Sequence, residues 1–519
     1  MFSLFGYLWS LSLLTNIVLF LSFSILAGVA ILIYNFVIVP KLFIRRYTAQ
    51  GIKSCFYKGL DPLKAWEKAA REHNDAFYYW VDFVYNNPNV PGFITNVGPN
   101  MQLQLTDSKY IKEFYSKEID YYKKGWIVET VGLLLGGSMA FEEYNVWKAR
   151  RRIFSQAFHF DFLHERLGII ENQAIKFCMK VHPSKVESFN AFRESKLLMA
   201  DMVGELFFGK DLSNVKVEGE IIGHYIADLF EEAIAAFTTP VSMLMGTKLI
   251  AKKLLPSHKD VFRKKEMFRQ VCKGLIKERE EEMKTFPESY VPQNFLEIMI
   301  KARKTDLDAK IDDNAMIQEF FGMFFAAVDT TSVLLSKLFY FISAYPHMRE
   351  KILKEIDDTN WTLGQPLTMQ IINKLEYLHA FIKETLRFNG VSIYVAERVA
   401  IKDHQLLDLK IKKGDTLAVC HRAMSFNPKV YTDPYLFNPE RFLQKSGSTD
   451  PFSFVPFSQG KRVCLGQHLA VLEAKVVILH FIKRYETALP KDYKFQLHVE
   501  SVNYLPIEPL ILKPIPRSQ

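Results

Sequence analysis

The chain has 519 residues, 49% of them hydrophobic, and a formal net charge of +9. This composition excludes an intrinsically disordered chain and supplies enough apolar side chains for a large core. A net positive charge is compatible with three kinds of negatively charged partner: anionic lipid, an acidic protein or nucleic acid. The basic residues are scattered, with no zinc-finger spacing and no aromatic-glycine RNA signature, so we expect no nucleic-acid partner.

The first 40 residues contain no charged side chain, and the first such residue is Lys41. This run exceeds the roughly 20 residues that cross a bilayer, and it lacks the basic start and small-residue cleavage site of a secretory signal. We therefore predict a retained transmembrane signal anchor over 1–40, with its best span at about 17–39. Residues 2–14 would lie in the interface or form a second, short crossing. Basic residues follow the span, so the positive-inside rule places the body in the cytosol.

The body, 41–519, shows no second uncharged run of that length and no internal repeat, which predicts one unit. Alternating segments predict a small β region at 93–105, around a Gly-Pro-Asn turn, and at 391–395 and 404–419. Helical patterns dominate elsewhere. Residues 259–284 predict a charged surface helix, and 314–346 predict a long core helix that begins after Asp312 and Asp313 and ends before Pro346. The predicted fold class is mainly α with a smaller β region.

The five cysteines are widely spread and form no C-x-x-C pair, as in a reduced, cytosol-facing protein. Cys420 beside His421 is half of a zinc pattern, but no second pair stands at a suitable spacing. Any special cysteine is therefore expected to act alone. The five are Cys55, Cys178, Cys272, Cys420 and Cys464.

The stretch FSQGKRVCLG, residues 457–466, singles out Cys464. Apolar residues recur at helical spacing after it, which places the thiol at or just before a helix amino terminus, where the dipole favours the thiolate. Gly460 and Gly466 permit tight turns and close approach of the backbone to a flat group. A buried structural cysteine and a cysteine nucleophile with a distant histidine base remain open on these residues alone.

The wider pattern resembles a known family. Phe457, Gly460, Arg462, Cys464 and Gly466 reproduce the F-x-x-G-x-R-x-C-x-G signature of the haem-thiolate monooxygenases, the cytochrome P-450 superfamily, and the anchor resembles its microsomal membrane-bound type. The resemblance implies haem b (iron protoporphyrin IX) as cofactor, with Cys464 as the iron ligand.

Further matches follow in the family's order along the chain. Glu384 and Arg387 in KETLRF resemble the family's E-x-x-R helix, and Arg441 in FNPERF resembles its partner loop. The resemblance implies a buried charge network among these three residues. In isolation, an E-x-x-R pair would be read as an ordinary surface pair on a helix.

The resemblance also implies contacts and roles at the haem. Trp147 and Arg151 in WKARR, together with Arg398 and Arg462, match positions that hold the haem propionates. AAVDTT, residues 326–331, matches the oxygen-activation stretch, with Asp329 and Thr330 as the catalytic acid and alcohol. Thr330 is expected to bond back to the Ala326 carbonyl and bend the helix.

Two positions depart from the family pattern. Ala327 stands where the family usually has glycine, which implies a tighter groove beside the iron. The proline-rich turn that usually follows Arg387 is missing, because the chain continues as FNGVSIYVAER. The substrate-lining loop at 391–395 is therefore expected to follow another path.

The implied activity is insertion of one oxygen atom from dioxygen into a lipophilic small molecule, such as a sterol, fatty acid, terpenoid or xenobiotic. The implied electron donor is a membrane-bound NADPH-dependent flavin reductase, attracted to a basic face that includes Lys461 and the 150–152 arginines. The implied location is the endoplasmic reticulum membrane. The alternatives are an oxygen-independent haem-thiolate isomerase or dehydratase, which tends to lose the acid and alcohol, and a non-catalytic haem-binding protein.

Overall fold

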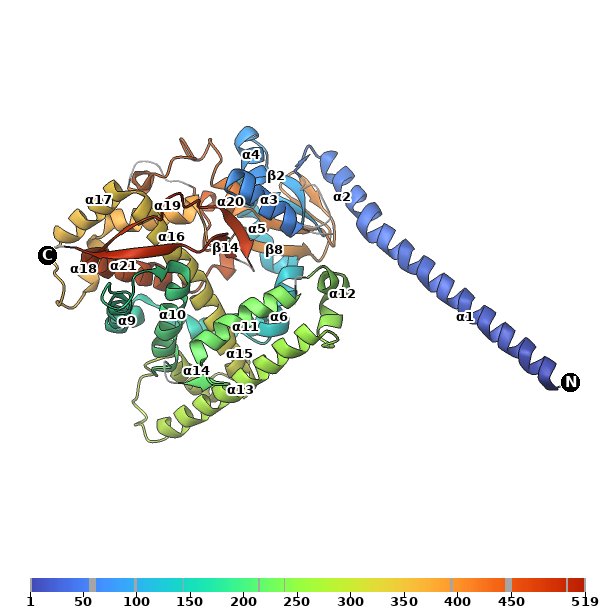
Figure 1. Cartoon of the computed structure of the whole chain (residues 1–519), viewed down its shortest axis with the longest axis horizontal. Helices are drawn as coiled ribbons and strands as arrows, with labels where there is room; N and C mark the ends of the chain where they lie inside the picture. Colours follow the sequence, from blue (N-terminus) through green and yellow to red (C-terminus); the bar gives the residue numbers. More distant parts are fainter. Residues whose placement is uncertain are drawn as a thin grey trace.

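A computed structural model describes residues 2–55, 62–97, 100–142, 144–212, 215–237, 239–392, 395–443, 450–500 and 503–517. Helices form most of the body, and the largest sheet lies on the side where α2 returns to it (Figure 1), so the predicted fold class is confirmed. The main helices are α1 (Phe2–Ile33), α2 (Val39–Thr48), α3 (Pro62–His73), α4 (Tyr78–Asn86), α5 (Ser108–Tyr121), α6 (Trp126–Leu135), α7 (Tyr144–Phe154), α8 (Phe160–Glu165), α9 (Leu167–Lys180), α10 (Ala191–Val203), α11 (Ile222–Phe237), α12 (Pro240–Ile250), α13 (Pro256–Met283), α14 (Phe295–Thr305), α15 (Asp313–Phe324), α16 (Thr330–Ala344), α17 (Pro346–Asp357), α18 (Met369–Lys374), α19 (Glu376–Phe388), α20 (His421–Met424) and α21 (Gln467–Arg484).

The predicted core helix is one axis divided into α15, the π-helical turn η6 (Phe325–Asp329) and α16. The Asp312 carboxylate caps its start by accepting the Ala315 N–H, and Pro346 begins the next helix. The segment Asp313–Ala344 is long and apolar enough to cross a membrane, but 72% of its most apolar window is buried inside the protein. It is therefore the core helix that its pattern predicts.

The largest sheet has six strands in the order β1-β2-β3-β11-β8-β4. The segment predicted at 93–105 forms the hairpin β2 (Gly92–Val97) and β3 (Asn100–Leu105), although Gly98 and Pro99 of its turn lie outside the described residues. The segment at 404–419 forms three strands, because an extra turn at Leu407, with φ +55°, separates β9 (His404–Leu406) from β10 (Leu409–Ile411). The other strands of this sheet are β1 (Lys53–Ser54), β4 (Tyr122–Lys124), β8 (Val395–Ala400) and β11 (Thr416–Val419).

The remaining strands form smaller sheets. Strand β15 lies between β12 and β5, and β13 pairs with β14. Of the segment predicted as β at 391–395, Ile393 and Tyr394 lie outside the described residues and Val395 begins β8. The bounds are β5 (Phe189–Asn190), β6 (Lys216–Val217), β7 (Glu220–Ile221), β12 (Tyr485–Ala488), β13 (Leu497–Glu500), β14 (Asn503–Pro506) and β15 (Ile511–Pro516).

Helix α1 projects away from the body (Figure 1), and its apolar side chains are exposed: Phe20 is 70% and Phe23 71% accessible. Residues 2–14 continue the same helix as the predicted span, without a reversal between them. After the π-helical turn η1 (Tyr34–Ile38), α2 returns to the body by burying Phe43 and Tyr47. The chain therefore changes from exposed apolar helix to packed core at about residue 40.

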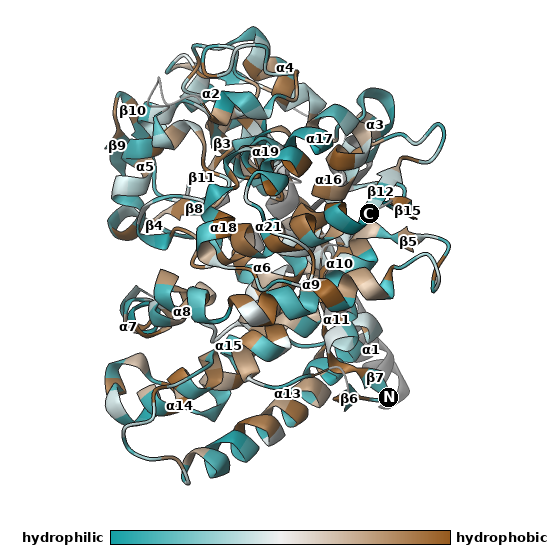
Figure 2. Cartoon of the chain, turned by 90° about the vertical axis from the view of Figure 1, so that its left-hand side faces the viewer, coloured by the Kyte–Doolittle hydropathy of each residue, from teal (hydrophilic) through white to brown (hydrophobic). Residues whose placement is uncertain are grey.

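Helix α13 confirms the predicted charged surface helix. Hydrophilic and hydrophobic residues alternate along it at the lower edge of the body (Figure 2). Val261, Phe268 and Cys272 share its buried face, while most of its lysine and glutamate side chains face solvent. It is one of the outer helices that enclose the core helix α15–η6–α16.

Candidate functional site

Cys464 lies in a loop three residues before α21. Gly460 has φ +75°, the left-handed region that favours glycine, and the Cys464 N–H donates to the Phe457 carbonyl at 2.9 Å. Burial raises the pKa of the Cys464 thiol, while the N–H groups of Gly466 and Gln467 and the charge of Arg151 act in the opposite direction. Of the five cysteines, Cys464 is the exposed one. It is thus accessible, and Arg151 and the two N–H groups offset part of the rise in its pKa.

Helix α7 brings two predicted site residues to this loop. Arg151 faces Cys464: burial lowers the pKa of its guanidinium, and the neighbouring thiol raises it. The Arg462 guanidinium lies over the Trp147 ring, 4.6 Å from its centroid. The structure thus places Arg151 of α7 beside the sulfur and Arg462 of the cysteine loop over the Trp147 ring, where both can meet anionic groups.

The side chains of Arg150, Arg151 and Arg152 point in three different directions. Arg150 is buried and donates to the Glu319 carboxylate at 2.9 Å, whereas Arg152 pairs with Asp306. Arg151 alone of the three faces Cys464. Arg150 is therefore a structural residue and adds nothing to a basic surface.

Arg398, on β8, has a partner that the sequence did not reveal. Its Nε donates to the Glu118 carboxylate of α5 at 2.9 Å, and its Nη1 donates to the Glu397 carbonyl at 2.8 Å. The guanidinium is only 12% exposed, so this pair is well shielded from water. Any contact of Arg398 with a bound group would therefore be made by a guanidinium already oriented by Glu118.

The core helix opens at the residues predicted to activate oxygen. The Thr330 hydroxyl donates to the Ala326 carbonyl at 2.5 Å, next to the π-helical turn η6. Ala326 is exposed and Thr330 half-buried, although most side chains along this helix are buried. Such back-bonding bends helices, and π-helical turns occur at functional sites. The π-helical turn forms with alanine at position 327, where the family usually has glycine.

Asp329 faces a buried lysine on another helix. Its Oδ1 lies 3.8 Å from the Nζ of Lys196 on α10, and that amine also bonds the Glu231 carboxylate of α11. Asp329 is 5% and Lys196 6% exposed, whereas the Glu231 side chain is about half exposed. Sequence reasoning missed Lys196, because a lysine in an amphipathic helix is usually solvated.

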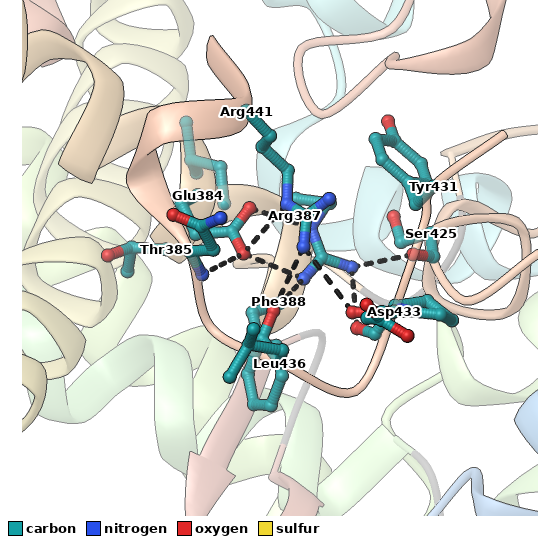
Figure 3. A network of polar contacts seen from close by, with 12 residues as sticks. Glu384, Thr385, Arg387, Phe388, Ser425, Tyr431, Asp433, Leu436 and Arg441 are labelled. Atoms are coloured by element: carbon teal, nitrogen blue, oxygen red, sulfur yellow. Dashed lines mark hydrogen bonds and ion pairs between the residues drawn. The ribbon is translucent and has the colours of Figure 1, made fainter. Parts of the chain in front are cut away.

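The three residues of the predicted charge network lie together in the structure (Figure 3). The Arg387 Nε and Nη2 donate to the two Glu384 carboxylate oxygens at 2.7 and 2.8 Å, and the Arg441 Nε donates to the same carboxylate at 3.2 Å. Glu384 and Arg387 are both 0% exposed. Arg387 also donates to the carbonyls of Ser425, Pro434 and Leu436. This network is enclosed and fully hydrogen-bonded.

The zinc interpretation of Cys420 and His421 gains no support. Cys420 is buried, and the His421 Nε2 donates to the Leu386 carbonyl. Among the residues that the structure describes, no group of three His, Cys, Asp or Glu side chains is arranged to hold a metal ion.

The residues around Cys464 fit a haem. The accessible thiol can supply one axial ligand, with the N–H groups of Gly466 and Gln467 aimed at its sulfur. Arg151 and Arg462 offer cations to two carboxylates, and Arg462 is kept in place by Trp147. Glycine at 466 leaves room near Phe158, whose ring a Cβ there would meet at 3.9 Å. Thr330 and Ala326 present an accessible polar notch on the core helix.

Comparison with known proteins agrees with this donor set. The chain is 26% identical over 404 residues to cytochrome P450 4V2 of Rattus norvegicus, covering 74% of this chain and 73% of that protein. It is 30% identical over 224 residues to cytochrome P450 3A5 of Homo sapiens, covering 42% and 44%. Two solved folds match: a retinoic acid-bound cyanobacterial CYP120A1 (TM-score 0.70, 21% identity, 82% of this chain and 92% of that one) and a cytochrome P450DA mutant haem domain (TM-score 0.73, 19% identity, 86% and 94%).

The family profile named Cytochrome P450 matches residues 83–513, which is most of the chain. Members of this family are haem-thiolate monooxygenases that use cysteine-ligated haem b, redox partners and lipophilic substrates. The chain therefore belongs to the cytochrome P450 family.

Proposed function

We propose that this protein is a membrane-anchored monooxygenase that inserts one oxygen atom from dioxygen into a sterol, fatty acid, terpenoid or xenobiotic. A cysteine-ligated haem, when bound, supplies the activation of dioxygen and the oxidation of a C–H bond. The observation that carries the proposal is the pairing of an accessible Cys464 with the Thr330–Ala326 bend. Isomerases and dehydratases tend to lose the acid and alcohol that this chain keeps.

Each site residue has a proposed task in this chemistry. Cys464 would hold the haem iron through its sulfur, and the adjacent N–H groups would stabilise the thiolate by opposing the rise in pKa that burial causes. Trp147, Arg151, Arg398 and Arg462 orient and neutralise the haem carboxylates, while Phe457, Gly460 and Gly466 shape the loop. The Thr330 hydroxyl and the Asp329 carboxylate hold and pass protons at the bend. Glu384, Arg387 and Arg441 brace the fold beneath the site.

Helix α11, which we propose as the roof of the pocket, supports a lipophilic substrate through its apolar side chains. Helix α11 packs on the bend, with the Phe230 and Phe325 ring centroids 4.9 Å apart. Phe325 and Ala326 offer carbon surface beside Thr330. A pocket with such walls favours a lipophilic molecule, because burying its surface contributes about 25 cal/mol per Å² of apolar area.

The proposed electron donor is an NADPH-dependent flavin reductase in the same membrane. Lys461 is exposed beside the cysteine loop and can attract an acidic partner, whereas Arg150 cannot because it is buried. We further propose that 1–40 is a transmembrane anchor, that 41–519 is the haem domain, and that this domain faces the cytosol at the endoplasmic reticulum. The exposed apolar face of α1 and the packing of α2 onto the body support this division.

The test is reconstitution of the purified full-length holoprotein with NADPH, a flavin reductase and a panel of fatty acids, sterols, terpenoids and aromatic drugs. We expect a substrate-induced spectral change with at least one compound, followed by NADPH-dependent and oxygen-dependent product. Turnover of a peroxide without NADPH would instead favour an isomerase or dehydratase. Haem binding with no turnover of any compound would favour a carrier.

A truncation tests the proposed anchor. Deleting 1–40 removes α1 and keeps Phe43, Tyr47 and the Arg46–Asp415 ion pair, whose Nη1 and Oδ1 lie 2.6 Å apart. We expect much of the shortened protein to leave the membrane fraction and to retain haem, with some attachment through apolar surface near the roof. A shortened protein without haem would show that the anchor and body are not separable.

A further inference from the structure

The carboxyl end of α19 lies where the expected proline-rich turn is missing. The last carbonyls of a helix have no intrahelical donor and need partners from elsewhere. Here the chain leaves the helix as Asn389 and Gly390, and the Asn389 N–H still reaches the Thr385 carbonyl at 2.8 Å. The following carbonyls are satisfied by side chains from other elements.

Three side chains donate hydrogen bonds to the backbone carbonyls of every second residue from 386 to 390. The His421 Nε2 donates to Leu386 at 3.1 Å, and the Arg422 guanidinium donates to Phe388. The Lys337 Nζ donates to Gly390 at 2.6 Å. The first two donors come from α20, whereas Lys337 comes from the core helix α16. The core helix is thus tied directly to the backbone just beyond α19.

Lys337 is an unexpected residue at its position. It is 0% exposed in an apolar helix, and burial lowers its pKa well below the ordinary lysine value, assisted by the positive charge of Arg422 and opposed by Asp75. Burying an amine is costly unless hydrogen bonds compensate. The hydrogen bond to the Gly390 carbonyl offsets part of this cost. Asp75 pairs with Arg422 and adds negative charge to the cluster.

The bond fixes the chain at the start of the predicted substrate-lining segment. Gly390 passes so close to its neighbours that a Cβ there would meet the Leu386 carbonyl oxygen at 3.0 Å and the His421 ring at 3.1 Å. The next residue, Val391, is half-buried and packs on the main core, and the chain then enters β8. A shift at Gly390 would therefore move the segment at 391–395.

We propose that Lys337 is a positioning residue for substrate specificity: its bond to the Gly390 carbonyl replaces the missing proline-rich turn and fixes Gly390 and Val391, where the predicted substrate-lining segment begins. The inference rests on the proposed function, in which this segment lines the pocket. Lys337 acts through the backbone of Gly390 and touches neither substrate nor haem in this account.

The test uses the full-length holoprotein carrying Lys337→Met, which keeps an unbranched side chain one atom shorter and removes its donor. Amide hydrogen exchange in peptides covering 389–395 should become roughly tenfold faster, because a buried carbonyl has lost its donor. Dissociation constants from substrate-induced spectral shifts should change unequally across the lipophilic panel, so that ratios between compounds shift by about threefold or more. The thiolate-type spectrum of the reduced carbon monoxide complex should persist.

The chain offers a matched control in Lys475, a second buried lysine, whose Nζ donates to the Ile372 carbonyl at 3.0 Å. Lys475→Met removes the same kind of bond at a different place. We expect faster exchange near Ile372, unchanged exchange at 389–395 and unchanged affinity ratios. A control that alters the ratios equally would overturn the proposal, because any buried lysine would then have the same effect.

If Lys337→Met yields no haem-containing protein, Lys337→Gln is measured in the same way, since its shorter side chain keeps a donor. Loss of haem in both variants would show that Lys337 is needed for folding and that the positioning role is wrong. A retained thiolate spectrum with unchanged exchange and unchanged ratios would also overturn it. Failure of the proposed function is distinguishable, because it appears in the unmodified protein as absent NADPH-dependent product.

Discussion

Two regions of this protein differ in how they place polar side chains: one buries and pairs them, and the other leaves them accessible. Around Arg387, the guanidinium donates to Glu384 and to three backbone carbonyls, and neither charged residue is exposed. Around Cys464, the thiol is accessible, and the Thr330 hydroxyl lies half-buried at a bend. The first region satisfies its charges within the chain, whereas the second keeps a thiol and a hydroxyl accessible for a cofactor and a substrate.

This difference separates residues that hold the fold from residues that perform chemistry. A buried charge with all its hydrogen bonds made is costly to disturb, because removing one partner strands the other. An accessible thiol or hydroxyl contributes little to packing, so its replacement should leave the fold intact. Substitutions in the two regions should therefore differ in kind.

The largest expected effect is at the ligand. Cys464→His should remove the strongly red-shifted Soret band of the reduced carbon monoxide complex, by shifting it to the histidine-ligated position or by losing haem. The protein should remain folded, because Cys464 is exposed. Absorbance spectra and circular dichroism measure both outcomes. Cys55→Ser, at a half-buried cysteine, should keep the band, and an unchanged spectrum in Cys464→His would remove this residue from the site.

Glu384→Ala should damage the fold before the chemistry. It leaves Arg387 and Arg441 without their shared carboxylate. The free energy of unfolding should fall by about 3–5 kcal/mol, which is comparable with much of a domain's stability. The yield of soluble, haem-containing protein should fall sharply. Glu67→Ala, which breaks an exposed ion pair with Arg71, should cost about 1 kcal/mol or less. A normal yield from Glu384→Ala would contradict the enclosed network.

Acid should destabilise the enclosed region. Burial, with Arg422 and Arg387 nearby, lowers the pKa of His421 to about 4 from 6.5. The unfolded chain therefore binds a proton that the folded chain excludes, so stability is present above pH 6.5 and decreases as the pH falls toward 4. The expected loss is on the order of 3 kcal/mol. Denaturant midpoints between pH 7 and 4 measure it, and His421→Gln should flatten this dependence; an equally steep curve would assign the acid sensitivity to other groups.

The smallest effect should be at the bend. Thr330→Val should preserve haem binding, substrate binding and reduction of the haem. Product per NADPH should fall about tenfold, which corresponds to about 1.4 kcal/mol of activation free energy. Dioxygen should then be lost as hydrogen peroxide, and supplying peroxide directly should reduce the defect. Ser343→Ala removes a similar bond on the same helix, from the hydroxyl to the Phe339 carbonyl at 2.7 Å. This control should not lower the amount of product formed per NADPH consumed. Equal loss of product by both routes would indicate a change in pocket shape.

Much of the fold could be predicted because its signals are local. The alternation at 93–105 predicted a hairpin, and the apolar run after Asp312 predicted the core helix, since periodicity and capping act within a few residues. The three strands in 404–419 were not separated in the prediction. The extra turn is at Leu407, a residue that rarely adopts positive φ, so nothing in its type indicated a turn.

By itself, the sequence determined the composition of the site: the spacing around Cys464, the Glu384–Arg387 pair and the Asp329–Thr330 pair are contiguous motifs. Only the tertiary structure decided their partners. Arg398 meets Glu118 across 280 positions, and Lys337 meets Gly390 across 53. The physical reason is that a helix or loop motif is fixed by bonds within a few residues. The choice of partner for a buried charge depends instead on which distant elements pack against it.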